Sequence, residues 1–200
     1  MATRLFAARG FGDTSLQLIA DEVGVTKQAV LHHFSSKEAL RQAVIDVILD
    51  HWRDVLPRVL LAAAASEDRF DAVLGELYRF FAADPDRGRL LVRESFDRPA
   101  EVKRVLAESV RPWLDAVASY ITRGREAGHH HADVDPEVYV LHVMQLVITA
   151  TASASVLDAA IAPGSDARAR YERELMRIAR ASLFKPATHH ERGKRRRGEP

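Results

Sequence analysis

The 200-residue chain contains no cysteine. That absence excludes disulfide bonds, a zinc site with thiolate ligands and a cysteine nucleophile. Familiar catalytic patterns are missing as well, because the sequence has no Gly-x-Ser-x-Gly elbow, no phosphate-binding loop and no His-Glu-x-x-His pair. We therefore predict that the chain is not an enzyme and needs no cofactor.

An excess of one charge is also lacking, since 29 Lys and Arg residues stand against 28 Asp and Glu residues for a net charge of +1. Residues 1–50 hold five basic and six acidic side chains, and only residues 185–200 are clearly basic, with six against two. Bulk charge therefore does not predict binding to nucleic acid. Any affinity for DNA has to come from a few well-placed contacts and from dimerisation.

One stretch, residues 138–157, lacks charged side chains over twenty positions, which is long enough to cross a bilayer. The polar residues His142, Gln145 and Thr149 lower its hydropathy, and small residues such as Ala152 suit close packing of helices. We predict a helix at a subunit interface, with no membrane partner. Residues 1–4 lead into an amphipathic segment and not into a signal peptide, so a cytoplasmic location is expected.

The most informative stretch is residues 14–40. Three helix-start signals follow one another: a capping box of Thr14 with Gln17, a cap at Thr26, and a second capping box of Ser35 with Glu38. Gly24 stands where the first of these helices has to end and the backbone has to turn sharply. The spacing predicts a helix-turn-helix unit whose recognition helix, about 27–34, enters a DNA major groove.

Four spaced motifs carry a family resemblance: FAARGF, TS-x-x-x-IA-x-x-x-GV, K-x-x-x-x-HHF and SKEAL. They resemble the DNA-binding head of TetR-type transcriptional regulators and cover about the first quarter of the chain. The rest is similar to the family only in length and helical pattern. The resemblance implies an all-α fold with a three-helix DNA-binding head at 1–46, a ligand-binding and dimerisation bundle at 47–184, and a basic disordered tail at 185–200.

The resemblance also implies the function and the partners. We expect a repressor that binds double-stranded operator DNA as a homodimer and leaves it when a small lipophilic effector binds. An alternative is a ligand-binding or interaction module whose DNA head has weakened. The family's first helix normally begins several residues before Ala2, so we expect a misassigned start; a shortened helix without an arm is the other possibility.

The resemblance places DNA contacts on the recognition helix and its edges. Candidates for base edges are Lys27, Gln28 and His32, and candidates for phosphates are Thr14, Thr26, His33 and Lys37. Thr14 and Thr26 are also needed as helix caps, and His33 could simply pack, whereas Lys27 and Lys37 have no evident structural role. Leu31 stands where the family usually has tyrosine, whose hydroxyl would bind a phosphate. Losing this hydrogen bond should weaken DNA binding by about 0.5–1.5 kcal/mol per half-site, although leucine can contact a thymine methyl.

Further helices are predicted along the rest of the chain. The residues Leu40, Val44, Val47, Ile48, Trp52 and Val55 form one apolar stripe on a long helix, which Pro57 kinks or ends. Helices follow at about 69–83, 85–96 and 99–127, the last interrupted at Pro112. Asp135 and Pro136 start a helix that runs to about 161, and a final helix spans 166–184.

Three sets of residues remain as candidates in the bundle. Large apolar side chains and two polar ones could line an effector pocket, or form ordinary core: Trp52, Phe80, Phe81, Phe96, Trp113, Tyr120 and Met144, with Arg93 and His142. A two-fold interface is expected from Val138, Leu141, Gln145 and Ala152, with Tyr171, Leu175, Ile178 and Ser182. The run of histidines at 129–131 lacks the spacing of a metal site, so no metal is expected there.

Overall fold

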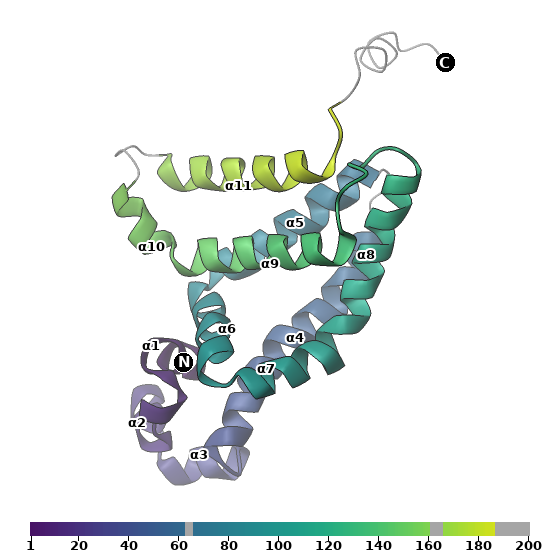
Figure 1. Ribbon diagram of the computed structural model, residues 1–200. Coiled ribbons are helices and arrows are strands. Elements are labelled where there is room, and N and C mark those ends of the chain that lie inside the picture. Colours follow the sequence, from purple (N-terminus) through teal and green to yellow (C-terminus); the bar gives the residue numbers. More distant parts are fainter. Residues whose placement is uncertain (63–65, 161–165, 187–200) are drawn as a thin grey trace.

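The computed structural model describes residues 1–62, 66–160 and 166–186. Within these ranges the chain is almost entirely helical, and extended backbone pairs only in an isolated bridge between His130 and Phe184 (Figure 1). The all-α prediction is confirmed. None of the described helices is long and apolar enough to span a bilayer.

The helices fall into a small head and a larger bundle. The head comprises α1 (Ala2–Asp13), α2 (Leu16–Val23), α3 (Lys27–His33) and the first turns of α4 (Lys37–Ala62). The bundle comprises the rest of α4, α5 (Ser66–Ala83), α6 (Pro85–Asp97), α7 (Pro99–Val105), the π-helical turn η1 (Leu106–Val110), α8 (Arg111–Glu126), α9 (Pro136–Ala152), α10 (Ala154–Leu157), the 3-10 turn η2 (Asp158–Ala160) and α11 (Ala167–Leu183).

The head packs firmly on the bundle. Its hydrophobic core, which includes the fully buried Phe6 of α1, continues into Leu90 of α6 and Val110 of η1. The two helices α1 and α6 lie against each other, and Arg93 Nε of α6 donates to the Ala7 carbonyl of α1 at 3.1 Å (Figure 1). Since α4 also runs without a break across the predicted boundary at residue 46, movements of α4 or α6 reach the head directly.

Several local predictions are confirmed. Gly24 ends α2 in the left-handed region with φ +73°, where glycine has no Cβ penalty. Thr26 caps α3, its hydroxyl oxygen accepting from the Ala29 amide at 3.1 Å. Asp135 caps α9 in the same way, accepting from the Val138 amide at 3.0 Å, with Pro136 in the first helical turn.

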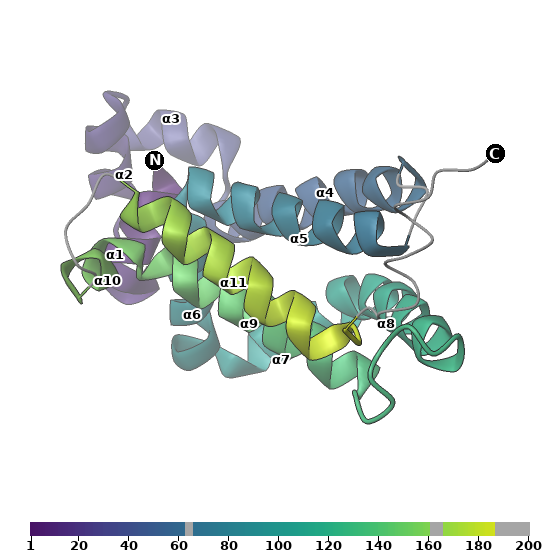
Figure 2. The same cartoon turned by 90° about the horizontal axis from the view of Figure 1, so that it is seen from above.

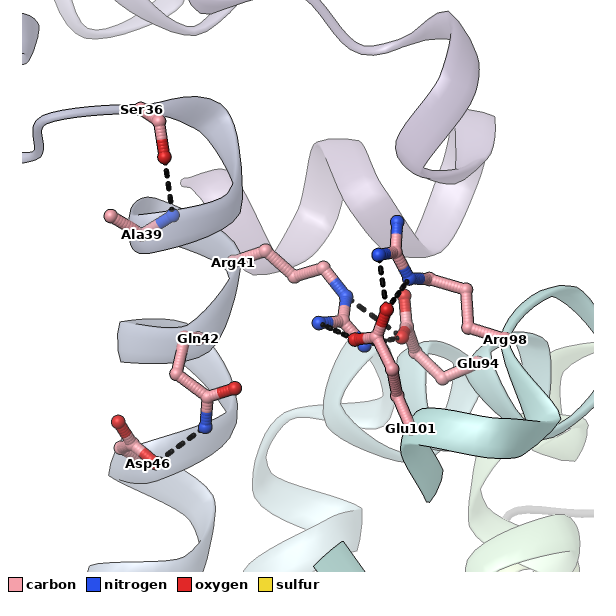
Figure 3. Close-up of polar contacts among 8 residues, drawn as sticks. All are labelled: Ser36, Ala39, Arg41, Gln42, Asp46, Glu94, Arg98 and Glu101. Atoms are coloured by element: carbon pink, nitrogen blue, oxygen red, sulfur yellow. Dashed lines mark hydrogen bonds and ion pairs between the residues drawn. The ribbon is translucent and has the colours of Figure 1, made fainter. Parts of the chain in front are cut away.

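Two capping boxes are wrong by one residue. Ser15 caps α2 in place of Thr14, accepting from Leu18 N at 3.0 Å. Ser36 caps α4 in place of Ser35, accepting from Ala39 N at 3.0 Å (Figure 3). Each site offers two adjacent hydroxyl residues. At α2 packing decides between them, because Thr14 is completely buried and therefore cannot take the exposed capping position.

Pro57 does not end the long helix, which was one of the two predicted outcomes, because α4 continues through it to Ala62. Arg58 Nε donates to the Asp54 carbonyl at 2.8 Å, which adds a side-chain donor in the turn where proline has no N–H. Val47, predicted in the apolar stripe, is 68% exposed, whereas Ile45 and Leu49 are buried instead. The helix therefore turns its buried face partly toward α6 and partly toward α5.

The bundle is built around α9, which contacts α5, α6, α8 and α11 (Figures 1 and 2). Tyr139 of α9 donates its hydroxyl to the Ala179 carbonyl of α11 at 2.6 Å, and burial raises the pKa of this phenol. The helix ends at Ala152, earlier than predicted, and α10 follows. In the predicted stripe of α11, Leu175 faces the core and Ile178 faces outward.

His130 anchors the α8–α9 connection to the end of α11. Its ring is fully buried, donates from Nδ1 to the Ile121 carbonyl at 3.0 Å and meets the Phe184 ring edge-on. A Cβ at Gly124 would lie 2.0 Å from this ring, so only glycine leaves room for it. Within the described residues Nε2 has no partner, which fits a neutral imidazole that is protonated at Nδ1.

We expect His130 to make the protein sensitive to acid. Burial lowers the pKa of His130, and the nearby His129 lowers it further. The hydrogen bond to the Ile121 carbonyl acts in the opposite direction but does not outweigh them. Histidine in an unfolded chain has a pKa of about 6.5. Just below that pH, His130 is therefore protonated in the unfolded chain but remains neutral in the folded chain. Stability should then fall as the pH drops from about 6.5 toward the folded pKa, by at most about 1.4 kcal/mol per pH unit.

Urea unfolding between about pH 7.5 and 5 measures this contribution. His130→Gln should give a shallower pH dependence than the parent chain, because it removes the group whose pKa burial lowers. Equal slopes for the two proteins would show that His130 is not the group responsible.

Candidate nucleic-acid interface and internal cavity

The most exposed polar surface of the head is the outer side of α3. Val30 points inward beneath α2, and α3 lies at the far end of the head in Figure 1. Six predicted DNA-contact residues on α3 and at its N-cap are exposed: Thr26, Lys27, Gln28, Leu31, His32 and His33. Among the described residues the side chains of Lys27 and Gln28 have no hydrogen-bond or ion-pair partner, so both are available to an external ligand.

The α2–α3 turn fixes the angle at which this face is presented. The Gly24 amide donates to the Asp21 carbonyl at 3.2 Å, and the Val25 amide donates to the Ala20 carbonyl at 2.9 Å. Helix α2 contacts α3, and Ala20 of α2 is fully buried. A side chain as small as that of alanine allows two helices to cross closely. The arrangement is a helix-turn-helix with its second helix free to enter a groove.

Two of the predicted phosphate contacts have other roles in the fold. The Thr14 hydroxyl is buried and donates to the Gly10 carbonyl at 2.7 Å, so it is not accessible to a phosphate. Lys37 Nζ donates to the Phe11 carbonyl at 2.7 Å and to the Gly12 carbonyl at 3.3 Å, and lies 4.3 Å from the centre of the Phe11 ring. Lys37 therefore satisfies the C-terminal carbonyls of α1, a role that its sequence position did not indicate.

The bundle contains a cavity of about 480 Å³, open to the surface, between α4, α5, α6, α7, α8 and α9. Five of the predicted pocket residues line it: Trp52, Phe81, Phe96, Trp113 and Met144. Apolar side chains from α4, α7 and η1 complete most of the wall. A largely apolar cavity of this size with a few polar groups is typical of small-molecule sites.

The other four predicted pocket residues lie elsewhere. The Phe80 ring stacks on His51 with 4.1 Å between ring centres, Arg93 binds α1, and His142 is exposed on α9. Tyr120 lines a second, apolar cavity of about 80 Å³. The two cavities share Trp52, Trp113, Leu77 and Met144 as a common wall.

A buried ionic cluster, which we call the Arg41 cluster, borders the larger cavity (Figure 3). It comprises Arg41 of α4, Glu94 of α6, Glu101 of α7, and Arg98, which is the N-cap residue of α7. Arg41 donates from Nε to Glu94 at 2.8 Å and pairs through Nη1 with Glu101 at 2.7 Å; Arg98 Nε donates to the other oxygen of Glu101 at 2.9 Å. The cluster thus ties α4 to α6 and α7.

The charges of the cluster stabilise one another. Burial acts to lower the pKa of Arg41, but the hydrogen bonds and charges of Glu94 and Glu101 outweigh it and raise this pKa. The hydrogen bond from Arg98 is the main cause of a lowered pKa for Glu101. Both shifts favour the ionised forms of Arg41 and Glu101.

The same cluster touches the head. The guanidinium of Arg98 lies 4.5 Å from the centre of the Phe11 ring, and that of Arg41 lies 6.0 Å from it. With Lys37, three cations surround this one ring of α1. Cation–π contacts of this kind are worth about 0.5–2 kcal/mol each, so the cavity wall and the head share a contact.

Sequence reasoning missed this cluster. A signal was present, because Arg41 stands four residues before Ile45 and eleven before Trp52, in phase with an apolar helical stripe. A charged residue in such a stripe needs a buried partner. Its partner Glu94 lies 53 residues further along the chain, which a helical pattern alone does not reveal.

Two family models match the chain. Residues 1–44 match "Bacterial regulatory proteins, tetR family", and residues 90–170 match "Tetracyclin repressor-like, C-terminal domain". The chain belongs to the TetR family. It is a DNA-binding transcriptional regulator, and the match over residues 1–44 coincides with the helix-turn-helix head described above.

Individual TetR-family proteins support this assignment. An HTH-type transcriptional regulator of Haemophilus influenzae is 25% identical over 191 residues, covering 96% of this chain and 89% of the relative. The repressor KstR2 of Rhodococcus jostii is 23% identical over 146 residues, covering 69% and 68%. The solved structure of KstR2 of Mycobacterium tuberculosis has a TM-score of 0.68 at 18% identity, covers 92% of each chain, and shares the fold.

The residues predicted at a TetR-type dimer interface divide into three groups. Val138, Ile178 and Ser182 lie exposed on the outer faces of α9 and α11. Leu141 and Gln145, although exposed, line the cavity. Leu175 is buried within its own chain, and Ala152 and Tyr171 are half-buried, with Ala152 packed close to Gly88 of α6. A buried Leu175 does not fit an interface, because its surface is already covered.

Proposed function

We propose that this TetR-family regulator is a repressor that binds operator DNA as a homodimer, acts in the cytoplasm, and is released when a small lipophilic effector fills the cavity of about 480 Å³. The observation that carries the proposal is the position of this cavity. One of its walls is α4, and only three residues separate the start of this helix from the end of the recognition helix. An effector that moves α4 must therefore move the head.

The size of the coupling needed is modest. Two recognition helices of a dimer have to sit about 34–36 Å apart to enter successive major grooves. If the effector favours a different spacing, DNA and effector oppose each other reciprocally, and a coupling of roughly 1–3 kcal/mol lowers DNA affinity about 5- to 150-fold. The packing of α1 on α6 and on α4, together with the Arg41–Glu94 ion pair that joins α4 to α6, supports a rigid transmission of such a shift.

We assign the second copy of the chain to the outer faces of α9 and α11. These two helices lie side by side (Figures 1 and 2). The side chains of Val138 and Ile178 on them are exposed. Two such helices from each protomer would form a four-helix interface across a two-fold axis. Ile178→Glu should weaken this interface without disturbing the core, because Ile178 is 46% exposed.

The experiment is fluorescence anisotropy of the chain on DNA taken from upstream of its own gene, against scrambled DNA, over a salt series. We expect preference for the upstream DNA and a negative slope of log K against log salt. Ile178→Glu should bind more weakly at equal concentration, as a dimer-deficient control. Steroids, fatty acids and lipophilic amines are then added to the complex, and at least one class should release the DNA.

The direction of control is tested separately, by a promoter reporter with and without the regulator. KstR2 of Rhodococcus jostii is named a repressor, whereas FasR of Mycolicibacterium smegmatis is named an activator. A repressor lowers reporter expression and the effector restores it. Higher expression in the presence of the regulator would overturn the repressor proposal while leaving DNA binding intact.

The exposed Leu31 supports a second candidate, an interaction module with a weakened DNA head. Leucine offers no hydrogen bond to a phosphate, and the head carries no excess of basic residues. If the chain showed no preference for any DNA selected from a random library, this second function would replace the first.

A further inference from the structure

We propose that the effector is a lipophilic cation, an amine or a quaternary onium compound, which the carboxylates of the Arg41 cluster and the aromatic wall of the cavity recognise. This inference rests on the proposed function, because it names the chemistry of the molecule that fills the cavity. It also predicts that lipophilic carboxylates of similar size are poor effectors.

The charge of the cavity wall is the first argument. Of the residues that line the cavity, three are charged: Arg41, Glu94 and Glu101. Their sum is −1, because Arg98, the counter-charge that neutralises the cluster, does not line the cavity and lies instead over the Phe11 ring of the head. A cation in the cavity would contact two carboxylates against one guanidinium at the wall, where Arg41 and Glu94 are only 7% and 3% exposed and Coulomb interactions are stronger than in water.

The engagement of Arg41 is the second argument. Its Nε and Nη2 both donate to Glu94, and its Nη1 pairs with Glu101. A ligand carboxylate would have to displace one of these two carboxylates or add a third to the same guanidinium. Like charges at such distances disfavour one another strongly when buried.

The aromatic wall is the third argument. Trp52, Phe81, Phe96 and Trp113 all line the cavity. The face of an aromatic ring carries a negative quadrupole that attracts cations, and tryptophan is the strongest of these rings. The same rings supply apolar contact to the body of the ligand, so one wall serves both parts of a lipophilic cation.

A cation at this position would also act on the head. It competes with Arg41 for Glu94 and Glu101, and so loosens the contacts that hold α4 to α6 and α7. Arg41 and Arg98 both border Phe11 of α1, so a change in their pairing changes the surroundings of the head. The ion pairs that the cation disrupts when it binds would then be the same ion pairs that hold the head in its DNA-binding position.

The test compares two ions of the same shape and opposite charge, tetraphenylphosphonium and tetraphenylborate. Both tryptophans of the chain, Trp52 and Trp113, line the cavity, so intrinsic tryptophan fluorescence reports its occupancy without a label. We expect the phosphonium to bind at least about tenfold more tightly than the borate, corresponding to about 1.4 kcal/mol.

The informative variant is Glu101→Gln, since Glu101 is partly exposed and its loss leaves Arg41 paired with Glu94. Glu108→Gln is the matched control, because Glu108 lies outside the cavity lining and pairs with Arg104 on the surface. Glu101→Gln should weaken phosphonium binding about fivefold or more and narrow its advantage over borate, whereas the control should leave both affinities unchanged.

The outcomes separate the two proposals. Equal or tighter binding of the borate, no binding of the phosphonium, or equal behaviour of Glu101→Gln and Glu108→Gln would overturn the assignment of a cationic effector. If the phosphonium binds as expected and yet does not release operator DNA, the cation site stands and effector-controlled release fails. If another class of molecule releases the DNA, release stands and the cation site fails.

Discussion

Replacing Glu94 with alanine is expected to lower the free energy of unfolding by about 3–5 kcal/mol, the cost of leaving a buried charge without its partner. The side chains of Arg41 and Glu94 are only 7% and 3% exposed. Alanine at position 94 removes the acceptor of two Arg41 hydrogen bonds and leaves the guanidinium buried with the partly exposed Glu101 alone. Urea unfolding followed by circular dichroism measures the loss.

Two further variants decide how the loss should be interpreted. Glu101→Ala should cost clearly less, because its carboxylate is 35% exposed and solvent can replace part of the interaction. The double variant Arg41→Met with Glu94→Leu should recover most of the stability, since a buried ion pair often contributes no more than a well-packed apolar pair. A cost for Glu94→Ala below about 1 kcal/mol would contradict the view that this pair is desolvated.

The second large effect is expected at the recognition helix. Lys27→Ala together with Gln28→Ala should weaken binding to the preferred DNA at least about 30-fold, because a lost base contact costs about 1–3 kcal/mol and a dimer loses it twice. Both side chains are exposed and unpaired among the described residues, so their removal leaves the fold intact. Anisotropy titrations over a salt series measure the change.

The salt series also separates base contacts from phosphate contacts. If Lys27 binds a phosphate, the slope of log K against log salt becomes shallower by about one for each half-site. Lys185→Ala is the matched control, because it removes the same charge beyond the end of α11, far from α3 (Figure 1). If the control and the double variant weakened binding equally, α3 would not be the surface that reads DNA.

The two effects act on different parts of one mechanism. The first concerns the ion pairs that hold α4 against α6 and α7, and the second concerns the surface that α3 presents to DNA. Since α4 follows directly after α3, the orientation of the head depends on how α4 is held. We therefore expect variants of the Arg41 cluster to alter DNA affinity as well as stability, even though none of these residues lies on α3.

Local signals in the sequence determined the head. The left-handed position of Gly24 and the cap at Thr26 depend on a few neighbouring residues, and both were predicted correctly. The Asp135–Pro136 start of α9 in the bundle is equally local and was also predicted correctly. The choice between adjacent hydroxyls was not local, because burial of Thr14 moved the cap of α2 to Ser15. The motifs of residues 1–40 were likewise enough to indicate the family, since the recognition helix is a continuous segment of the chain.

Only the tertiary structure decided the bundle. The wall of the cavity comes from helices that are far apart in the sequence. The sequence therefore indicated candidate aromatic residues but not which of them lie together in the cavity wall. Phe81 lines the cavity, whereas the adjacent Phe80 does not. Arg41 pairs with Glu94, which lies 53 residues away in the sequence, and Lys37 binds a carbonyl at the end of α1 and is not a free cation. Local conformation depends on neighbours along the chain, whereas charge pairing and cavity shape depend on neighbours in space.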